Sequence, residues 1–202
     1  MQKNIPEYYN NLDNIYLKVW ELLNSGLKNR NAPFHIPVFT CGNKPDSRIV
    51  VLRGLNEKEK KIWFHSDLRS NKVTILKSNS DSTLLFYDKS EKIQLRIFGN
   101  AKINYQNNLT ENSWKKTVHM SRQCYLGDKA PGSAATEPTS GLTEIVDNLK
   151  YSKEDSEAGY KNFCVIEVFI KSIDWLYLAA KGHRRASFLL KNNLLEKKWL
   201  IP

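Results

Sequence analysis

The sequence predicts a mainly β fold with peripheral helices, in which antiparallel strands form a closed or partly open, Greek-key-like β-barrel. Short β-like runs follow one another along the chain, with turn clusters between them and no obligatory helix after each. Helical spacing of apolar residues is confined to a few separate stretches. A barrel also covers the strand edges that an open sheet would expose. With 202 residues, of which 41% are hydrophobic, residues 1–202 can form a single domain with its own core.

The chain is expected to open with an amphipathic helix over about residues 8–30. Apolar residues recur there at helical spacing from Leu12 to Leu27, and glycine and asparagine residues then supply stop signals. A short helix is expected over Ser70–Lys77, with Ser70 as its N-cap. Strands are expected on both sides of this short helix, over Phe34–Thr40, Arg48–Leu55, Lys60–His65, Thr83–Tyr87 and Ile93–Ile103.

The second half of the chain changes character twice. A helix over Thr110–Met120 precedes an acidic stretch rich in glycine and proline, which predicts a long surface loop over about residues 126–160. Strand character returns at Phe163–Ser172 and Trp175–Ala179. These last runs belong to a C-terminal strand and basic segment of about 162–202.

The net charge of +10 indicates an anionic partner, and nucleic acid is the first candidate. Residues 104–160 hold 6 Lys+Arg against 8 Asp+Glu, so the positive surplus lies mainly on the segments that are predicted to be strands. It forms no run of five or more like charges, which is the usual sign of an arm that binds nucleic acid without regard to sequence.

No apolar run approaches the roughly 20 residues that a membrane-spanning helix needs. The first residues do not show the basic stretch and apolar core of a secretion signal, so no membrane association and a cytoplasmic location are expected. Cys41, Cys124 and Cys164 are an odd number at wide spacing, which matches neither a disulfide framework nor a paired metal site. Free thiols and no bound metal are expected.

Two segments place cations where they would meet an anion. In the strand from Arg48 to Arg53, a period of two puts Arg48 on one face and Arg53 on the other, so the strand can contact two groups of an extended ligand. Two solvated arginines at the strand ends are the alternative. The segment Phe64–Lys72 leads from a strand into a helix start, where free amides and Lys72 attract phosphate. Here the alternative is that Ser70 merely caps the helix.

Two further segments offer polar groups to a ligand. Gln94 alternates with apolar neighbours and would bond a heterocycle from a pocket wall, or else lies on an outward polar face. Lys181, His183 and Arg185 stand at alternate positions after Trp175. If extended, these three side chains point the same way and would hold a phosphate or carboxylate beside an aromatic wall. The alternative is a solvated basic loop.

In this order, the segments resemble the pyridoxamine 5′-phosphate oxidase family of flavin mononucleotide (FMN) binding split barrels, in its oxidase-related branch. The resemblance runs from about Trp20 to Pro202 and includes Leu84–Tyr87, Gln94–Arg96 and the ending Trp199–Pro202. It implies a split β-barrel, FMN as cofactor, and a homodimer with FMN at the subunit interface.

The resemblance also implies roles for individual residues. Arg48 and Lys72 would hold the FMN phosphate, with Asn71 standing where a cation is common beside it. His65 and Ser66 would touch the ribityl chain or the ring. Trp175 and Arg185 would come from the second subunit to the pyrimidine end. The full set expected to bind the cofactor is Arg48, Ile49, Val50, Val51, Leu52, Arg53, His65, Ser66, Asn71, Lys72, Gln94, Trp175 and Arg185.

The substrate side matches the family in part. Arg53, Arg122, Lys181 and His183 would bind a small phosphorylated or anionic substrate, and His183 or Arg185 would assist at the reacting carbon as catalytic residues. Val118 and Leu126 stand where the family has a tyrosine and a serine that help to hold the substrate phosphate.

The function that the resemblance implies is that of an FMN-dependent oxidoreductase, in which hydride passes from substrate to flavin N5 and then to oxygen or another acceptor. A non-catalytic or regulatory FMN-binding protein of the same fold is the alternative. Nucleic-acid binding is a remote third reading, because the basic strands lack the interleaved aromatic residues of single-strand binders. On the first two readings, small phosphates account for part of the positive charge.

Overall fold

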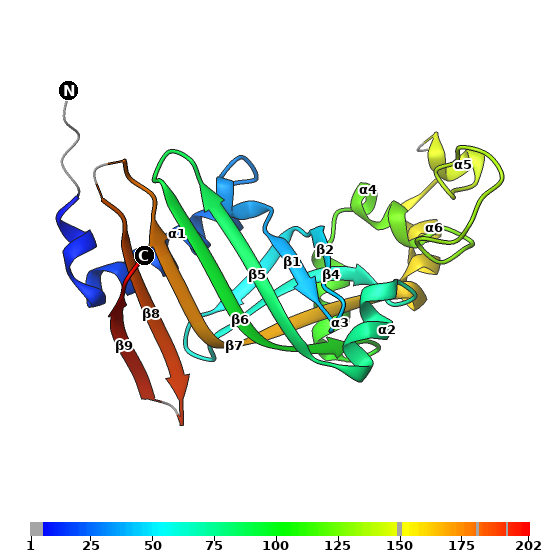
Figure 1. Ribbon diagram of the computed structural model, residues 1–202. Coiled ribbons are helices and arrows are strands. Elements are labelled where there is room, and N and C mark those ends of the chain that lie inside the picture. The colour runs from blue at the N-terminus through cyan, green and yellow to red at the C-terminus, as the bar shows by residue number, and fades with distance from the viewer. Residues whose placement is uncertain (1–5, 149–150, 181, 193) are drawn as a thin grey trace.

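Nine strands form one antiparallel sheet in the computed structural model, which describes residues 6–148, 151–180, 182–192 and 194–202 (Figure 1). The helices lie outside the sheet, as the sequence predicts. The strands are β1 (Val38–Cys41), β2 (Asp46–Ile49), β3 (Leu52–Asn56), β4 (Lys61–Asp67), β5 (Asp81–Asp88), β6 (Ile93–Asn104), β7 (Phe163–Tyr177), β8 (Arg184–Lys191) and β9 (Leu194–Leu200).

The order of the strands explains why the sheet curls. It runs β2-β1-β5-β6-β7-β4-β3, so β2 and β3, which are consecutive in the chain, lie at opposite ends of the path. Only Val50 and Val51 join them, and the three residue steps from Ile49 to Leu52 span no more than about 11 Å. The two ends of the sheet must therefore meet, and the covalent chain rather than a ladder of hydrogen bonds completes the ring. The predicted split barrel is confirmed.

The predicted strand Arg48–Leu55 is wrong in one respect, because it is interrupted. β2 pairs with β1 as far as Ile49, and the Val50 N–H then donates to the Pro37 carbonyl at 3.0 Å. β3 begins at Leu52 opposite Phe64 of β4. The chain thus leaves one ladder for another between Ile49 and Leu52.

β7 is a single strand of 15 residues rather than the two shorter runs expected, and at roughly 3.3 Å per residue it is roughly 50 Å long. It pairs with β6 from Val165 to Tyr177. Its first half also pairs with β4 and its second half with β8. β8 and β9 therefore extend the sheet at the end of β7 that lies away from β4 (Figure 1).

Helices pack around this framework. α1 (Leu12–Lys28) is capped by Asn11 and buries Ile15, Val19 and Leu23 in the main core. The helix expected over Thr110–Met120 is divided by the extended residues Thr117 and Val118. The remaining elements are η1 (Glu7–Asn10), η2 (Pro33–His35), α2 (Asn71–Ser78), α3 (Asn108–Lys116), α4 (His119–Arg122), η3 (Gln123–Tyr125), α5 (Glu144–Asp147), α6 (Lys153–Ser156) and η4 (Glu157–Asn162).

The long loop expected over 126–160 is thus partly helical, because it contains α5, α6 and the start of η4. These elements lie beyond the end of the sheet opposite β8 and β9 (Figure 1). A second, smaller core of Trp114, Tyr125, Phe163 and Val165 joins α3 and η3 to the start of β7. None of the described helices is long and apolar enough to cross a membrane.

Candidate functional site

A pocket of about 330 Å³ lies where the chain passes from β2 to β3, facing the turn between β4 and α2. It gathers residues that are far apart in the sequence, from β2 to the segment after η3. Eight residues of the predicted cofactor set line it: Arg48, Ile49, Val50, Val51, Arg53, His65, Ser66 and Lys72.

The interruption of the strand corrects the expected orientation of the two arginines. Arg48 and Arg53 still alternate in burial with their neighbours, as a period of two requires. Both nevertheless line the same pocket, because the chain changes ladder between them. One cation therefore reaches the pocket from β2, before the chain crosses to the other ladder, and one from β3, after this crossing.

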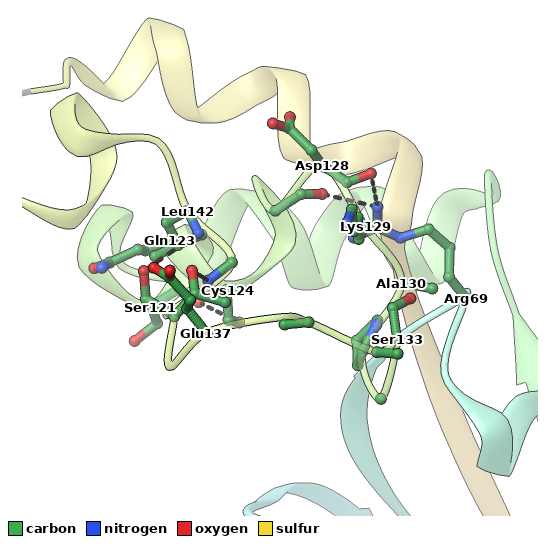
Figure 2. A pocket seen from close by; sticks show the side chains of 18 of the residues that line it. Arg69, Ser121, Gln123, Cys124, Asp128, Lys129, Ala130, Ser133, Glu137 and Leu142 are labelled. Carbon is green, nitrogen blue, oxygen red and sulfur yellow. Dashed lines mark hydrogen bonds between the residues drawn. The ribbon is translucent and has the colours of Figure 1, made fainter.

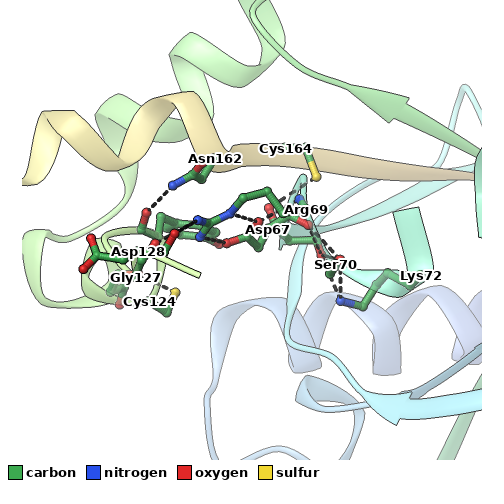
Figure 3. Close-up of polar contacts among 12 residues, drawn as sticks. Asp67, Arg69, Ser70, Lys72, Cys124, Gly127, Asp128, Asn162 and Cys164 are labelled. Carbon is green, nitrogen blue, oxygen red and sulfur yellow. Dashed lines mark hydrogen bonds and ion pairs between the residues drawn. The ribbon is translucent and has the colours of Figure 1, made fainter. Parts of the chain in front are cut away.

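Arg48 and Lys72 bring positive charge together at this pocket. The Arg48 guanidinium pairs with Asp46 and donates from Nη1 to Cys41 Sγ at 3.3 Å. Lys72 Nζ donates to the hydroxyls of Ser66 and Ser70 at 3.0 and 3.2 Å, so its direct partners carry no charge (Figure 3). Burial, and then the charge of Arg48, lower the pKa of Lys72. An anion between the two cations would remove this unfavourable interaction.

The start of α2 adds backbone donors to the same place. Ser70 is the N-cap residue, but its hydroxyl donates to the Asp67 carbonyl at 2.7 Å, and no described side chain caps the helix. Ser70 is thus the N-cap of α2 by position, as predicted, but its hydroxyl does not cap the helix. Asn71 is exposed, donates to Asp46 Oδ2 at 3.3 Å and does not line the pocket.

His65 supplies a ring that is neutral at pH 7. Its pKa is lowered to about 4, mainly by burial and secondarily by the charge of Arg53. The ring meets Phe163 edge-on, with 4.8 Å between centroids. An uncharged imidazole in the pocket wall offers one hydrogen-bond donor and one acceptor and adds no positive charge to the pocket.

Arg69 connects the turn before α2 to the segment that follows η3. Its guanidinium binds both carboxylate oxygens of Asp67, with Nε–Oδ1 at 3.1 Å and Nη2–Oδ2 at 2.8 Å. Its Nη1 donates to the carbonyls of Gly127 and Asp128 at 2.8 and 3.4 Å (Figure 3). Sequence reasoning missed Asp67 and Arg69 as site residues, although their spacing of two beside a helix start was visible.

A larger cavity of about 1060 Å³ adjoins the pocket and is lined mainly by residues 127–142 (Figure 2). The two spaces share Arg53, Ser121, Cys124 and Pro131. The segment after η3 thus touches the smaller pocket through Pro131.

Arg122 was expected to bind substrate phosphate, and the structure contradicts this role. Its side chain is 1% exposed, and Nη1 lies 2.5 Å from Glu157 Oε1. The same guanidinium donates to the Trp114 carbonyl at 2.8 Å and lies over the Trp114 ring, 4.5 Å from its centroid. It also donates to the Thr117 carbonyl and the Ser156 hydroxyl. Arg122 therefore joins α3 to η4 and is not available to a ligand.

The other half of the predicted set lies elsewhere in the chain. Gln94, Leu176 and Arg185 are neighbours across β6, β7 and β8, on the part of β7 remote from the pocket. Arg185 binds Asp174, with Nη2–Oδ2 at 2.8 Å, and Arg96 binds the same carboxylate. None of the predicted residues on β6, β7 or β8 lines either described cavity.

Trp175 and Leu52 are core residues rather than walls of the pocket. Trp175 is fully buried against Tyr9, with 5.2 Å between ring centroids, because β7 turns it inward. Leu52 is also buried, because the alternation of buried and exposed residues along β3 turns it inward and Arg53 outward. Neither side chain is open to a ligand.

The basic row after β7 is not an extended strand. Gly182 has φ of 124°, and β8 begins only at Arg184. The exposed His183 accepts a hydrogen bond at Nδ1 from the Ala179 N–H at 3.2 Å. Lys181, also expected to bind substrate, lies outside the described residues.

Comparison with known proteins matches residues 19–105 to the family model "Pyridoxamine 5′-phosphate oxidase, FMN-binding domain". A search of curated proteins finds no match. Among solved structures, a pyridoxamine 5′-phosphate oxidase-related, FMN binding protein from Nostoc punctiforme has a TM-score of 0.73 at 14% identity, over 98% of this chain and 100% of that one.

A second similar structure is PhzG from Burkholderia lata, in complex with tetrahydrophenazine-1-carboxylic acid. Its TM-score is 0.68 at 13% identity, over 99% of this chain and 98% of that one. The family match and the shared fold confirm the resemblance inferred from the sequence.

The role of Arg122 can be tested by its removal. Arg122→Met should lower the free energy of unfolding by about 3 kcal/mol, because the buried carbonyls and hydroxyl that it binds lose their donor. Urea unfolding of the variant measures this, with Lys116→Met at an exposed position of α3 as control. Unchanged stability together with lost binding of pyridoxamine 5′-phosphate would restore Arg122 to the substrate site.

The lowered pKa of His65 predicts an acid-sensitive stability. In the unfolded chain His65 is protonated below its usual pKa of 6.5. In the folded chain it stays neutral down to about pH 4. Stability is therefore lost as pH falls through this window. When the pH falls from 7 to 4.5, the unfolding free energy of the parent should drop by about 2–3 kcal/mol more than that of His65→Gln, because each unit of pKa shift corresponds to about 1.36 kcal/mol. Equal losses in urea titrations of the two proteins would contradict the assignment.

Proposed function

Because residues 19–105 match the FMN-binding domain of the pyridoxamine 5′-phosphate oxidase family, we propose that this chain binds FMN in the pocket at the β2–β3 crossing and acts as a flavin-dependent oxidoreductase. The observation that carries the proposal is the convergence of Arg48, Lys72 and the uncapped start of α2 on one pocket. Cations combined with free helix amides are the usual means of holding a phosphate.

The charge of the pocket suits the phosphate of FMN. Arg48, Arg53 and Lys72 line it; Arg48 is paired with Asp46, and the lining carboxylate Asp67 is bound by Arg69. Arg53 and Lys72 thus remain without a carboxylate partner among the described residues, and a phosphate monoester carries about −2 at pH 7. Lys72 would exchange a hydroxyl partner for a phosphate oxygen and regain the charge stabilisation that burial removes. The neighbouring segment Ile49–Val51 and Ser66 would then lie along the ribityl chain and ring.

FMN, when bound, supplies the hydride-accepting chemistry of such enzymes. This chain's own residues position the reactants and set the polarity of the site. The neutral His65 presents a donor and an acceptor beside the cofactor space, while Arg53 marks the side open to an anionic substrate. Pro131 lines the edge of the pocket that adjoins the larger cavity.

We also infer a homodimer, because the predicted site is divided along β7. The pocket lies near Phe163, whereas Gln94 and Arg185 lie on the opposite half of the strand. Only a second copy can bring these groups to the pocket. The outer face of the sheet beside them exposes the apolar side chains of Phe98 and Leu189. These two residues lie on either side of Ser172 of β7, Phe98 on β6 and Leu189 on β8.

Loss of a phosphate ligand gives the first test. Lys72→Ala or Arg48→Ala should weaken FMN binding by roughly 10-fold or more, since a hydrogen bond to a charged group contributes roughly 1.5–3 kcal/mol. Titration of the apoprotein with FMN, followed by flavin fluorescence, measures the change. Lys77→Ala, at an exposed site on the same helix, should bind FMN as the parent does. Equal affinities for all the proteins would refute the phosphate site.

The dimer can be tested on its proposed face. Phe98→Glu buries a charge in the interface, so the protein should elute as a monomer in size exclusion with light scattering and hold FMN at least ~10-fold more weakly. Leu17→Glu, on the exposed side of α1, is the control and should remain dimeric. A parent protein that is monomeric with FMN bound would contradict the proposal.

A further inference from the structure

A carboxylate lies at the edge of the proposed phosphate site, and phosphate binding does not explain its presence there. Asp46 and Arg48 stand two residues apart on the same face of β2, and both are partly buried. Asp46 forms an ion pair with Nη2 of the Arg48 guanidinium. Arg48 lines the pocket, whereas Asp46 does not. The arginine proposed to hold the phosphate therefore already has an anionic partner outside the pocket wall.

The same carboxylate also meets the start of α2. Asn71 is the first residue of this helix, and its Nδ2 donates to Asp46 Oδ2 at 3.3 Å. Oδ2 is also the atom that pairs with Arg48. The first turn of a helix attracts negative charge, because its leading amides have no partner within the helix. Asp46 thus contacts the two features, Arg48 and the start of α2, that the proposed function assigns to a phosphate.

The contacts of Asp46 favour the phosphate-free form of the site over the phosphate-bound form. Arg48 lies close enough to Lys72 to lower the pKa of that lysine, second only to burial as a cause. In the phosphate-free form, the negative charge of Asp46 offsets part of this repulsion between cations. In the phosphate-bound form the phosphate does so, and Asp46 then stands beside a second anion that repels it.

The balance of charge at the phosphate end shows the size of this effect. Arg48 and Lys72 supply two positive charges, and the ion pair with Asp46 cancels one of them. A phosphate monoester carries about −2 at pH 7, so the group with phosphate bound has a net charge of about −1. With an uncharged side chain at position 46 the same group would be neutral. Repulsion between neighbouring charges near a protein surface changes an equilibrium constant roughly 10-fold or more.

We propose that Asp46 is an internal counter-anion of the phosphate site. It lowers the affinity for FMN by repelling the phosphate, and it thereby makes the flavin an exchangeable cofactor rather than a permanently bound one. Asn71 holds the carboxylate in this place through its hydrogen bond. The proposal rests on the proposed function for the identity of the anion. Because Asp46 acts on the phosphate alone, riboflavin, which has none, should not be affected by it.

Removal of the charge at position 46 tests the proposal. Asp46→Asn keeps the size of the side chain and one oxygen acceptor for Arg48 and Asn71. The apoprotein is titrated with FMN and with riboflavin, followed by flavin fluorescence. The variant should bind FMN at least ~10-fold more tightly than the parent and riboflavin with unchanged affinity. Asp13→Asn, which removes an exposed carboxylate from its ion pair with Lys197, is the matched control and should bind both flavins as the parent does.

The ratio of the two affinities distinguishes a counter-anion from a residue that only supports the fold. FMN affinity that is equal to the parent's or weaker, in an Asp46→Asn variant with parental stability in urea, would overturn the proposal. An equal gain in affinity for FMN and riboflavin would also overturn it, because the effect would not depend on the phosphate.

Inorganic phosphate separates failure of this proposal from failure of the proposed function. If the parent binds neither flavin, the proposed function is wrong, and the rise in melting temperature with added phosphate then decides the role of Asp46. A larger rise in Asp46→Asn than in the parent supports the counter-anion, since phosphate binding to the folded state stabilises it in proportion to affinity. Equal rises, or a smaller one in the variant, would overturn it.

Discussion

The two-residue crossing at Val50 and Val51 is the constraint on which the rest of the structure depends. It ties together the two ends of the sheet path, so the sheet must curl into a barrel. Because the crossing residues leave one ladder before they join the next, the wall opens there, and the pocket forms in that opening. The segment that closes the barrel therefore also forms the pocket proposed as the binding site, with Arg48 before the crossing and Arg53 after it.

Ion pairs with carboxylates determine which of the many cations remain available to bind a ligand. Asp67 and Glu157 engage Arg69 and Arg122, and Asp174 engages both Arg96 and Arg185. These arginines join elements of the fold. Lys72 and Arg53 have no carboxylate within ion-pair distance among the described residues, and both face the cavities. The positive charges thus include some that join elements of the fold and a small number that line the two cavities.

The features that could be predicted from the sequence are those encoded within a few residues. The β4–α2 turn and Lys72 are local, so the start of the short helix and its cation were placed correctly, and alternation in β6 gave its inward and outward faces. Arg122 was misassigned because its partner Glu157 is 35 positions away, in a segment with no pattern of its own. Trp175 was misassigned because a period of two does not say which face of β7 is the inner one. The ladder change within 48–55 was also invisible, since both halves alternate as a single strand would.

The contact between Arg69 and the segment after η3 has a consequence for how such a protein can diversify. Arg69 binds the backbone carbonyls of Gly127 and Asp128 and not their side chains. Every residue type has a carbonyl, so mutations along 127–142 can accumulate without loosening the attachment. The residues that line the larger cavity can then change while the turn before α2, which we propose binds phosphate, stays under separate selection. One attachment that ignores side-chain identity lets the two halves of the site evolve at different rates.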